Sequence, residues 1–193
     1  MLTVVEPQPF QALAGLRVAV LVADGVKAIE LSEPRRLLEA HGAAFVLVSP
    51  QGAAVRSWRH GEWAERVTVD ELLEISRADL FGALYLPGGI MCADHLRADA
   101  HAIDFVRCFF GAGKPVAATG HAVAILIEAD VLAGRTVTSW PAMHTDVQNA
   151  GALWVQRAVV RGPCLVTSRM PADLDQLIPE MIDLFGSCHK CGA

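Results

Sequence analysis

Two glycine-containing turns, at residues 87–89 and 117–122, carry the groups of this chain that are best suited to bind a ligand. The sequence A-A-T-G-H-A at residues 117–122 is typical of a sharp junction between a strand and a helix, the geometry that presents the nucleophile in many hydrolases. Backbone N–H groups at the start of a helix favour negative charge. We therefore predict a site for a small anion or carboxylate at the amides of Gly88, Gly89, Gly120 and His121.

Lys27 and Glu30 follow the first apolar run and are further candidates for this site. The ammonium group of Lys27 would strengthen the binding of an anion. The alternatives are a solvated lysine, or an ion pair between Lys27 and Glu30 or Asp94. A desolvated amine could also form a Schiff base with an aldehyde, but nothing in the sequence indicates desolvation.

Five cysteines supply the only thiols of the chain. Cys92 follows the first glycine pair on a predicted loop beside the same pocket, as either a reactive thiol or an inert, partly buried one. Cys108 and Cys164 are expected to be packing residues. Cys188 and Cys191 form a C-H-K-C sequence with only half the ligands of a zinc site, so a flexible tail is favoured there.

No metal ion or other cofactor is predicted. Several histidines could approach Glu30 or Asp94, but they lack a ligand spacing such as H-x-x-x-H. His121, in the turn at residues 117–122, has no thiol partner there. We therefore expect it to be a hydrogen-bonded pocket residue rather than a base. The four tryptophans could line a pocket, although core or subunit contacts are more usual for large aromatic residues. The histidines are His60, His95, His121 and His144, and the tryptophans are Trp58, Trp63, Trp140 and Trp154.

These candidates lie between apolar runs that alternate with helical patterns. Continuous apolar runs bounded by glycine or proline predict strands that are buried on both faces. Apolar residues at helical spacing predict the helices between them. Strands are predicted at residues 16–23, 44–49, 83–86, 115–118, 135–138, 158–160 and 165–167, helices at 30–41, 101–110, 121–129 and 174–185, and a polar hairpin at 55–69.

The order of elements predicts an α/β fold with a mostly parallel central sheet. Strands without a polar face, joined through helices by right-handed crossovers, indicate a sheet covered on both sides. We expect a flavodoxin-like three-layer α/β/α sandwich in a single domain, with a core at residues 16–186 and tails at 1–15 and 187–193. Ligands of such sheets bind beyond the carboxyl ends of the strands, where the two turns described above lie.

Composition narrows the range of partners. The 193 residues carry a net charge of −5, and Lys and Arg are scattered, so nucleic acid is not an expected partner. No apolar stretch approaches the length of a bilayer span, and the first fifteen residues lack the pattern of a secretory signal. We therefore expect a soluble protein of the reducing cytoplasm, without membrane partners and without disulfides.

Six segments in register resemble the PfpI intracellular proteases of the DJ-1 superfamily, which share a class I glutamine-amidotransferase-like fold. The matching segments are residues 18–25, 86–89 (L-P-G-G), 113–117 (G-K-P-V-A), 138–141 (T-S-W-P), 146–151 (D-V-Q-N-A-G) and 167–174 (T-S-R-M-P-A-D-L). The resemblance implies cysteine peptidase, glyoxalase or glycation-repair chemistry. It also implies subunits that pair as homodimers or larger homo-oligomers, with sites near the interface.

The chain departs from this family at the residues that would perform the chemistry. The family motif A-x-C-H-G-P corresponds to A-T-G-H-A-V at residues 118–123, which places Gly120 at the nucleophile position. By register, Lys27 stands where the family has a glutamate that hydrogen-bonds the thiol. Asp94 matches an acidic residue that reaches the histidine from a neighbouring subunit.

Three functions remain open from the sequence. The favoured hypothesis is a catalytically degenerate protein that keeps a pocket for a small anion or carbonyl compound, with a role in stress responses. The second is an active glyoxalase, glycation-repair hydrolase or peptidase-like enzyme that uses Cys92, or a water held by His121 and Asp94. The third is a structural or regulatory dimer.

Overall fold

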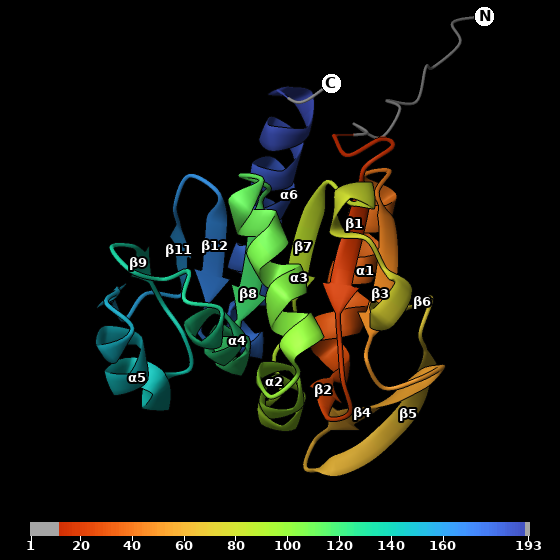
Figure 1. The fold of residues 1–193 in the computed structure, drawn as a ribbon, viewed down its shortest axis with the longest axis horizontal. Helices are drawn as coiled ribbons and strands as arrows, with labels where there is room; N and C mark the ends of the chain where they lie inside the picture. The colour runs from red at the N-terminus through yellow and green to blue at the C-terminus, as the bar shows by residue number, and fades with distance from the viewer. Residues whose placement is uncertain (1–11, 192–193) are drawn as a thin grey trace, which may run out of the picture.

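The computed structural model describes residues 12–191, and its centre is a seven-stranded sheet (Figure 1). The strands follow the spatial order β11-β12-β8-β7-β1-β3-β6, and all neighbours are parallel except β11 and β12. The mostly parallel α/β fold is therefore confirmed. The strands are β1 (Arg17–Leu21), β3 (Ala44–Ser49), β6 (Glu71–Leu72), β7 (Ala83–Leu86), β8 (Val116–Thr119), β11 (Val159–Arg161) and β12 (Leu165–Ser168).

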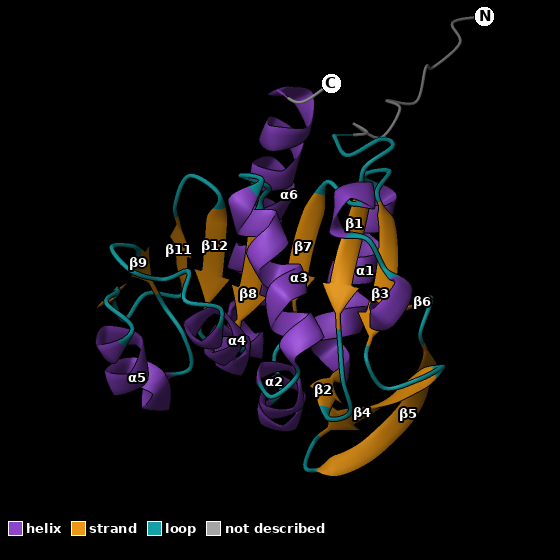
Figure 2. Cartoon of the chain, viewed as in Figure 1, coloured by secondary structure: helices purple, strands orange, loops and turns teal. Residues whose placement is uncertain are grey.

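Helices cover both faces of this sheet (Figure 2). Helices α2, α3 and α4 form one layer, and α1 and α6 pack together on the other face. The helices are α1 (Ala28–Ala40), α2 (Ile90–Arg97), α3 (Ala100–Gly111), α4 (Val123–Glu128), α5 (His144–Asn149) and α6 (Leu174–Cys191). Short 3-10 helices are η1 (Leu73–Ile75), η2 (Ala78–Leu80), η3 (Gly120–Ala122), η4 (Pro141–Met143) and η5 (Pro171–Asp173).

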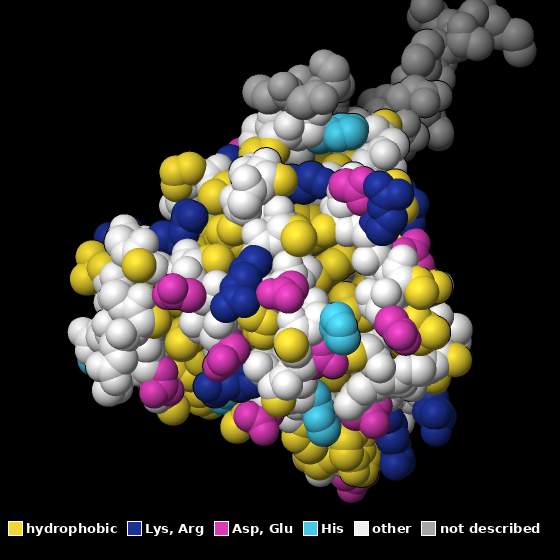
Figure 3. Space-filling view, viewed as in Figure 1, with side chains coloured by type: hydrophobic (Ala, Val, Ile, Leu, Met, Phe, Trp, Pro, Cys, Tyr) yellow, Lys and Arg dark blue, Asp and Glu magenta, His cyan; other side chains and the backbone are white. Residues whose placement is uncertain are grey.

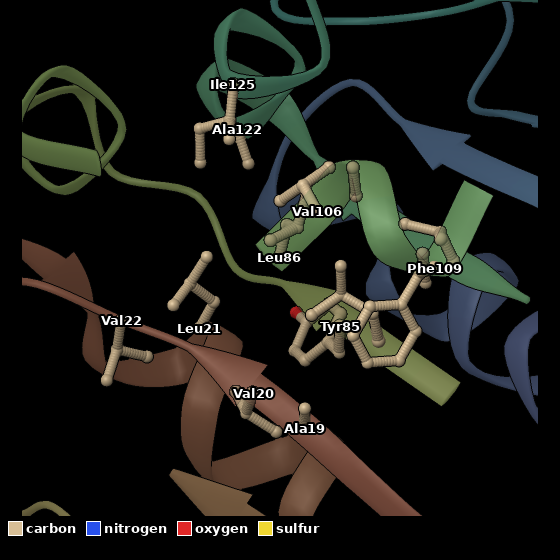
Figure 4. Close-up of a cluster of buried hydrophobic side chains, with 14 of the residues drawn as sticks. Ala19, Val20, Leu21, Val22, Tyr85, Leu86, Val106, Phe109, Ala122 and Ile125 are labelled. Atoms are coloured by element: carbon tan, nitrogen blue, oxygen red, sulfur yellow. The ribbon is translucent and has the colours of Figure 1, made fainter. Parts of the chain in front are cut away.

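Buried side chains fill the space between the central strands and the layer formed by α2, α3 and α4 (Figure 4), and α1 and α6 contribute further core residues on the other face. Every residue of β7 and β8 is buried, as parallel strands with helices on both faces require. Tyr85 on β7 and Phe109 on α3 are among the largest fully buried side chains. This packing fixes the carboxyl ends of β1, β7 and β8, where the candidate site lies.

A small second sheet stands beside the carboxyl ends of the strands. It contains β2 (Val26–Lys27), β4 (Ala54–Arg59) and β5 (Glu62–Thr68), in the order β2-β4-β5. The last two strands form the hairpin that the polar segment predicts. Two further strands, β9 (Thr136–Val137) and β10 (Leu153–Trp154), pair only with each other in a two-stranded sheet. The strand predicted at residues 135–138 is therefore confirmed as β9, but it lies outside the main sheet.

Two other expectations also need correction. Residues 90–97 form helix α2, although the sequence analysis interpreted this stretch as a loop. Helix α6 continues to Cys191, so residues 187–191 extend a helix instead of forming a tail. Residues 12–15 form a turn that buries Leu13 in the core, so they are not a tail either. The other predicted tail residues, 1–11 and 192–193, lie outside the described part of the chain. Among the described residues, no helix combines the length and the apolar character that crossing a bilayer requires.

Candidate active-site pocket

The turn after β8, called the elbow below (residues 119–121), has the strained backbone of a nucleophile elbow. Gly120 adopts φ +52°, a left-handed conformation that costs other residues on the order of 1 kcal/mol or more. A Cβ placed on Gly120 would lie 3.1 Å from the carbonyl oxygen of Arg169. The N–H of Trp140 donates to the Gly120 carbonyl at 3.3 Å and fixes the turn. Glycine relieves the strain of the elbow but supplies no nucleophile.

A buried carboxyl group lies beside this turn. Glu30 of α1 is 1% exposed, and its Oε2 accepts a hydrogen bond from the Gly88 N–H at 2.5 Å and another from the Thr119 hydroxyl. The Tyr85 hydroxyl donates to the Glu30 carbonyl oxygen at 2.9 Å. Among the described residues, Glu30 Oε1 has no hydrogen-bond partner. One oxygen is therefore anchored by two hydrogen bonds, and the other makes none with the described residues.

Burial raises the pKa of Glu30 from 4.5 to about 7. Desolvation is the main cause, because it penalises the charged carboxylate. The hydrogen bond from Gly88 and the nearby charge of Lys27 act in the opposite direction and offset part of the shift. Glu30 can therefore gain or lose a proton near neutral pH, as an acid-base group must.

The glycines of the P-G-G sequence make room for this carboxyl group. A Cβ on Gly88 would lie 2.7 Å from Glu30 Oε2, so a larger residue would displace the carboxyl group. Gly89 has φ +124°, and its Cβ would lie 2.3 Å from the carbonyl oxygen of Gly25. The Gly88 N–H already bonds Glu30, so the prediction that this amide binds an anion is wrong.

The structure also corrects the prediction that the pocket has lost its acidic residue. That interpretation rested on Lys27, which precedes α1 and leaves its ammonium 5.8 Å from the centre of the Trp140 ring. The acid is Glu30, three residues later. Lys27 forms no ion pair within the described residues, which argues against pairing with Glu30 or Asp94. Its positive charge remains available to a ligand.

His121 is the last residue of the elbow. Its ring is half-buried and stacks on Trp140, with ring centres 5.3 Å apart and an angle of 24° between the planes. Burial lowers the pKa of His121, and the charge of Lys27 lowers it further. His121 is therefore neutral at pH 7 and can donate or accept one hydrogen bond.

Two buried hydroxyl groups near the elbow are unpaired. Thr138 Oγ1 and Ser168 Oγ have no hydrogen-bond partner within residues 12–191. Ser168 ends β12 and pairs in register with Thr119, and the Thr138 N–H bonds the Thr167 hydroxyl. Buried hydroxyls nearly always find a partner, so these groups suit a polar ligand or ordered water. The sequence analysis did not identify them.

Cys92 cannot replace the missing thiol. It lies inside helix α2, is fully buried, and its sulfur accepts a hydrogen bond from the Ala23 N–H at 3.3 Å. Burial raises its pKa to about 12, whereas a nucleophilic cysteine needs a lowered pKa and access to substrate. The hypothesis of a reactive Cys92 is therefore wrong.

Thiol labelling tests this conclusion directly. In the native protein, iodoacetamide at pH 8 is expected to label the exposed Cys108 and leave Cys92 unmodified. After unfolding in urea, both should react. Peptide mass spectrometry measures the two sites separately. Equal labelling of Cys92 and Cys108 in the native state would contradict the inert assignment.

The other candidates do not join the elbow within one chain. Asp94 is exposed on α2 and makes no bond to His121 of its own chain, so its contact with the histidine of a neighbouring subunit stays a prediction. Cys108 is exposed, so its interpretation as a packing residue is wrong. No group of three metal-ligating side chains occurs in the part of the chain that the structure describes. His144 packs against Trp154 instead, with ring centres 4.8 Å apart.

Comparison with known sequences identifies the family of this chain. The model of the DJ-1/PfpI family matches residues 16–184. The chain belongs to the DJ-1/PfpI family. It is 38% identical over 169 residues to a deglycase of Pyrococcus abyssi, and the matched region covers 88% of this chain and 99% of that protein. It is 36% identical over 172 residues to protein/nucleic acid deglycase 2 of Escherichia coli, over 89% of this chain and 98% of the relative.

Solved structures of the family have the same fold. A two-domain protein of Anabaena variabilis, with DJ-1/ThiJ/PfpI-like and ferritin-like domains, superposes with a TM-score of 0.83 and 30% identity. The match covers 89% of this chain and 48% of that longer protein. DJ-1beta of Drosophila melanogaster superposes with a TM-score of 0.80 and 24% identity, over 89% of this chain and 91% of the other.

Proposed function

We propose that this protein has lost the thiol chemistry expected from its resemblance to PfpI proteases and binds a small carboxylate or carbonyl compound at the elbow. The observation that carries this proposal is Gly120, whose left-handed backbone keeps the elbow while its side chain is absent. Cys92 is a fully buried residue of helix α2 and offers no substitute. The pocket is thus a binding site without a thiol nucleophile.

The charges around the elbow favour an anionic or carbonyl ligand. Lys27 supplies a positive charge beside Trp140 that no acidic group of residues 12–191 pairs with, and neutral His121 supplies a hydrogen bond. Oε1 of Glu30 can accept a hydrogen bond from a ligand hydroxyl, or donate one to a carbonyl oxygen when protonated. A carboxylate at Lys27 with an oxygen directed toward Glu30 satisfies both groups.

The proposal also includes a biological role, a cellular compartment and an oligomeric state. The relatives named as deglycases support a role in protection against reactive carbonyl compounds, which would be a stress response. Four free cysteines in the described residues, Cys92, Cys108, Cys164 and Cys188, support a reducing cytoplasm. We also propose a homodimer or larger homo-oligomer, which light scattering coupled to size exclusion would measure.

Titration calorimetry with propanoate tests the proposal. Propanoate is expected to bind the native protein, and Lys27→Gln should weaken binding about tenfold because a charge-assisted hydrogen bond is lost. Arg36→Gln is the matched control, since it removes an exposed arginine of α1 that pairs with Glu33. Equal binding by the native protein and Lys27→Gln, or no binding at all, would contradict the proposal.

Glu30 supports a second candidate function, a glyoxalase-like enzyme in which its carboxylate activates water for addition to the aldehyde carbon of a ketoaldehyde. The aldehyde hydrogen would then move to the ketone carbon, which gives a hydroxy acid. A pKa of about 7 and a free Oε1 suit this role. The native chain would then consume methylglyoxal, and Glu30→Gln would abolish the activity. Absence of turnover above a buffer control excludes this candidate and leaves the binding function in place.

A further inference from the structure

A cleft of about 620 Å³ opens beside the elbow, between the start of α1, the hairpin of β4 and β5, and η5. This volume lies within the range of small-molecule sites, roughly 300–1,000 Å³. Its walls include Lys27, Ile29, Trp58, Arg59, His60 and Pro171. Of the protein groups proposed above to bind a ligand at the elbow, only Lys27 also lines this cleft.

Lys27 connects the cleft to the elbow. Its side chain lines the cleft, and its ammonium lies 5.8 Å from the centre of the Trp140 ring, which stacks on His121. Pro171 provides a second connection, because Arg169, two residues earlier, places its carbonyl oxygen against Gly120. A ligand held by Lys27 at the elbow can therefore extend into the cleft.

One wall of the cleft is apolar. Ile29 is 46% exposed, although α1 buries its neighbours Ala28 and Glu30. Trp58 is half-buried, and Trp63 braces it edge-on with ring centres 5.2 Å apart. The hairpin register shifts between Arg56 and Trp58, and such a β-bulge redirects the side chains next to it. The wall thus presents a flat indole and an aliphatic side chain.

The hairpin is a rigid wall. Arg59 and Glu62 pair across a two-residue turn, His60-Gly61, with φ values of +50° and +88°. Turns with two positive φ angles match the twist of the strands and hold a hairpin in one register. Figure 3 shows hydrophobic side chains gathered over this hairpin, with basic side chains beside them.

The cleft is basic. Its lining contains Lys27, Arg59 and His60 but no Asp or Glu. Arg59 pairs with Glu65 at 3.0 Å, whereas Lys27 and His60 have no ion pair within residues 12–191. The whole chain carries a net charge of −5, so the charge of Lys27, which has no ion pair among the described residues, distinguishes this cleft without Asp or Glu from the average surface.

We propose that the cleft binds the flat apolar tail of an organic anion whose carboxylate is held by Lys27 at the elbow. This inference rests on the proposed function and specifies its ligand: an aryl or similarly flat carboxylate, larger than the small compounds that the elbow alone would hold. The tail would pack between Trp58 and Ile29, and Pro171 would close the cleft below it.

A matched set of three probes tests the inference: 3-phenylpropanoate with head and tail, propanoate with the head alone, and 3-phenylpropanol with the tail alone. Calorimetry is expected to show 3-phenylpropanoate binding at least about tenfold more tightly than either of the others. Trp58→Ala should bring its affinity close to that of propanoate. Propanoate binding should not change in this variant, which also shows that the elbow remains folded.

The outcomes separate the two proposals. If propanoate binds but the phenyl group adds nothing, the cleft is not a tail site and the proposed function stands. If the phenyl group adds affinity that Trp58→Ala leaves intact, the tail lies elsewhere and the inference is wrong. Equal binding of 3-phenylpropanol and 3-phenylpropanoate would show that charge is not recognised, which also overturns it. If none of the probes binds, both proposals fail.

Discussion

Replacing Gly120 with cysteine is expected to create methylglyoxal-consuming activity at least on the order of 100-fold above that of the native chain. The new thiol would stand at the elbow beside His121, within the field of Lys27, which favours the thiolate. Glu30 bonds the hydroxyl of Thr119, the residue next to the new thiol, and is the group expected to exchange a proton with it. The activity of the variant and of the native chain is measured as the rate at which methylglyoxal disappears in a discontinuous assay.

Gly120→Ser is the matched control, because it imposes the same backbone strain without a thiol. Both variants are expected to lose on the order of 1–3 kcal/mol of unfolding free energy, since a side chain must adopt positive φ close to the Arg169 carbonyl. Urea denaturation checks that both remain folded at assay temperature. A folded but inactive Gly120→Cys variant would show that the pocket lacks more than its nucleophile.

The arrangement of the sheet follows from the sequence because its signals are local. Continuous apolar runs such as residues 16–23 and 44–49 become strands that are buried on both faces, and glycine or proline ends each run. The hairpin at 55–69 was identified by its polar character. Helix α2 was missed because no side chain caps its start, and Gly89 at the N-cap looks like a loop residue.

The chemistry of the pocket was harder to predict because it depends on distant partners. Glu30 bonds Gly88 and Thr119, which are 58 and 89 residues away in sequence. Assigning the acid by register placed it at Lys27, one turn too early. One local signal was present: Glu30 precedes Leu31 and shares the buried side of α1 with Pro34 and Leu38. A carboxyl group on the buried side of a helix indicates a buried partner.

Glu30→Gln is expected to make the protein more stable than the native chain at pH 8, by on the order of 3 kcal/mol, and by only about 1 kcal/mol at pH 5. The pKa of Glu30 is raised from 4.5 to about 7 by burial. Between these values the folded carboxyl group retains a proton that the unfolded chain has released. The folded state then binds more protons, so stability falls as pH rises through this window.

Urea unfolding at pH 5, 6, 7 and 8 measures this difference between the two proteins. Glutamine keeps an acceptor for Gly88 and Thr119 but cannot ionise, so the penalty that the native chain meets above pH 4.5 disappears. Glu33→Gln is the control, because Glu33 lies one turn away, is 40% exposed and pairs with Arg36. It should retain the native pH dependence. A constant difference between Glu30→Gln and the native chain from pH 5 to 8 would contradict the raised pKa, and with it the assignment of Glu30 as a proton-exchanging group of the pocket.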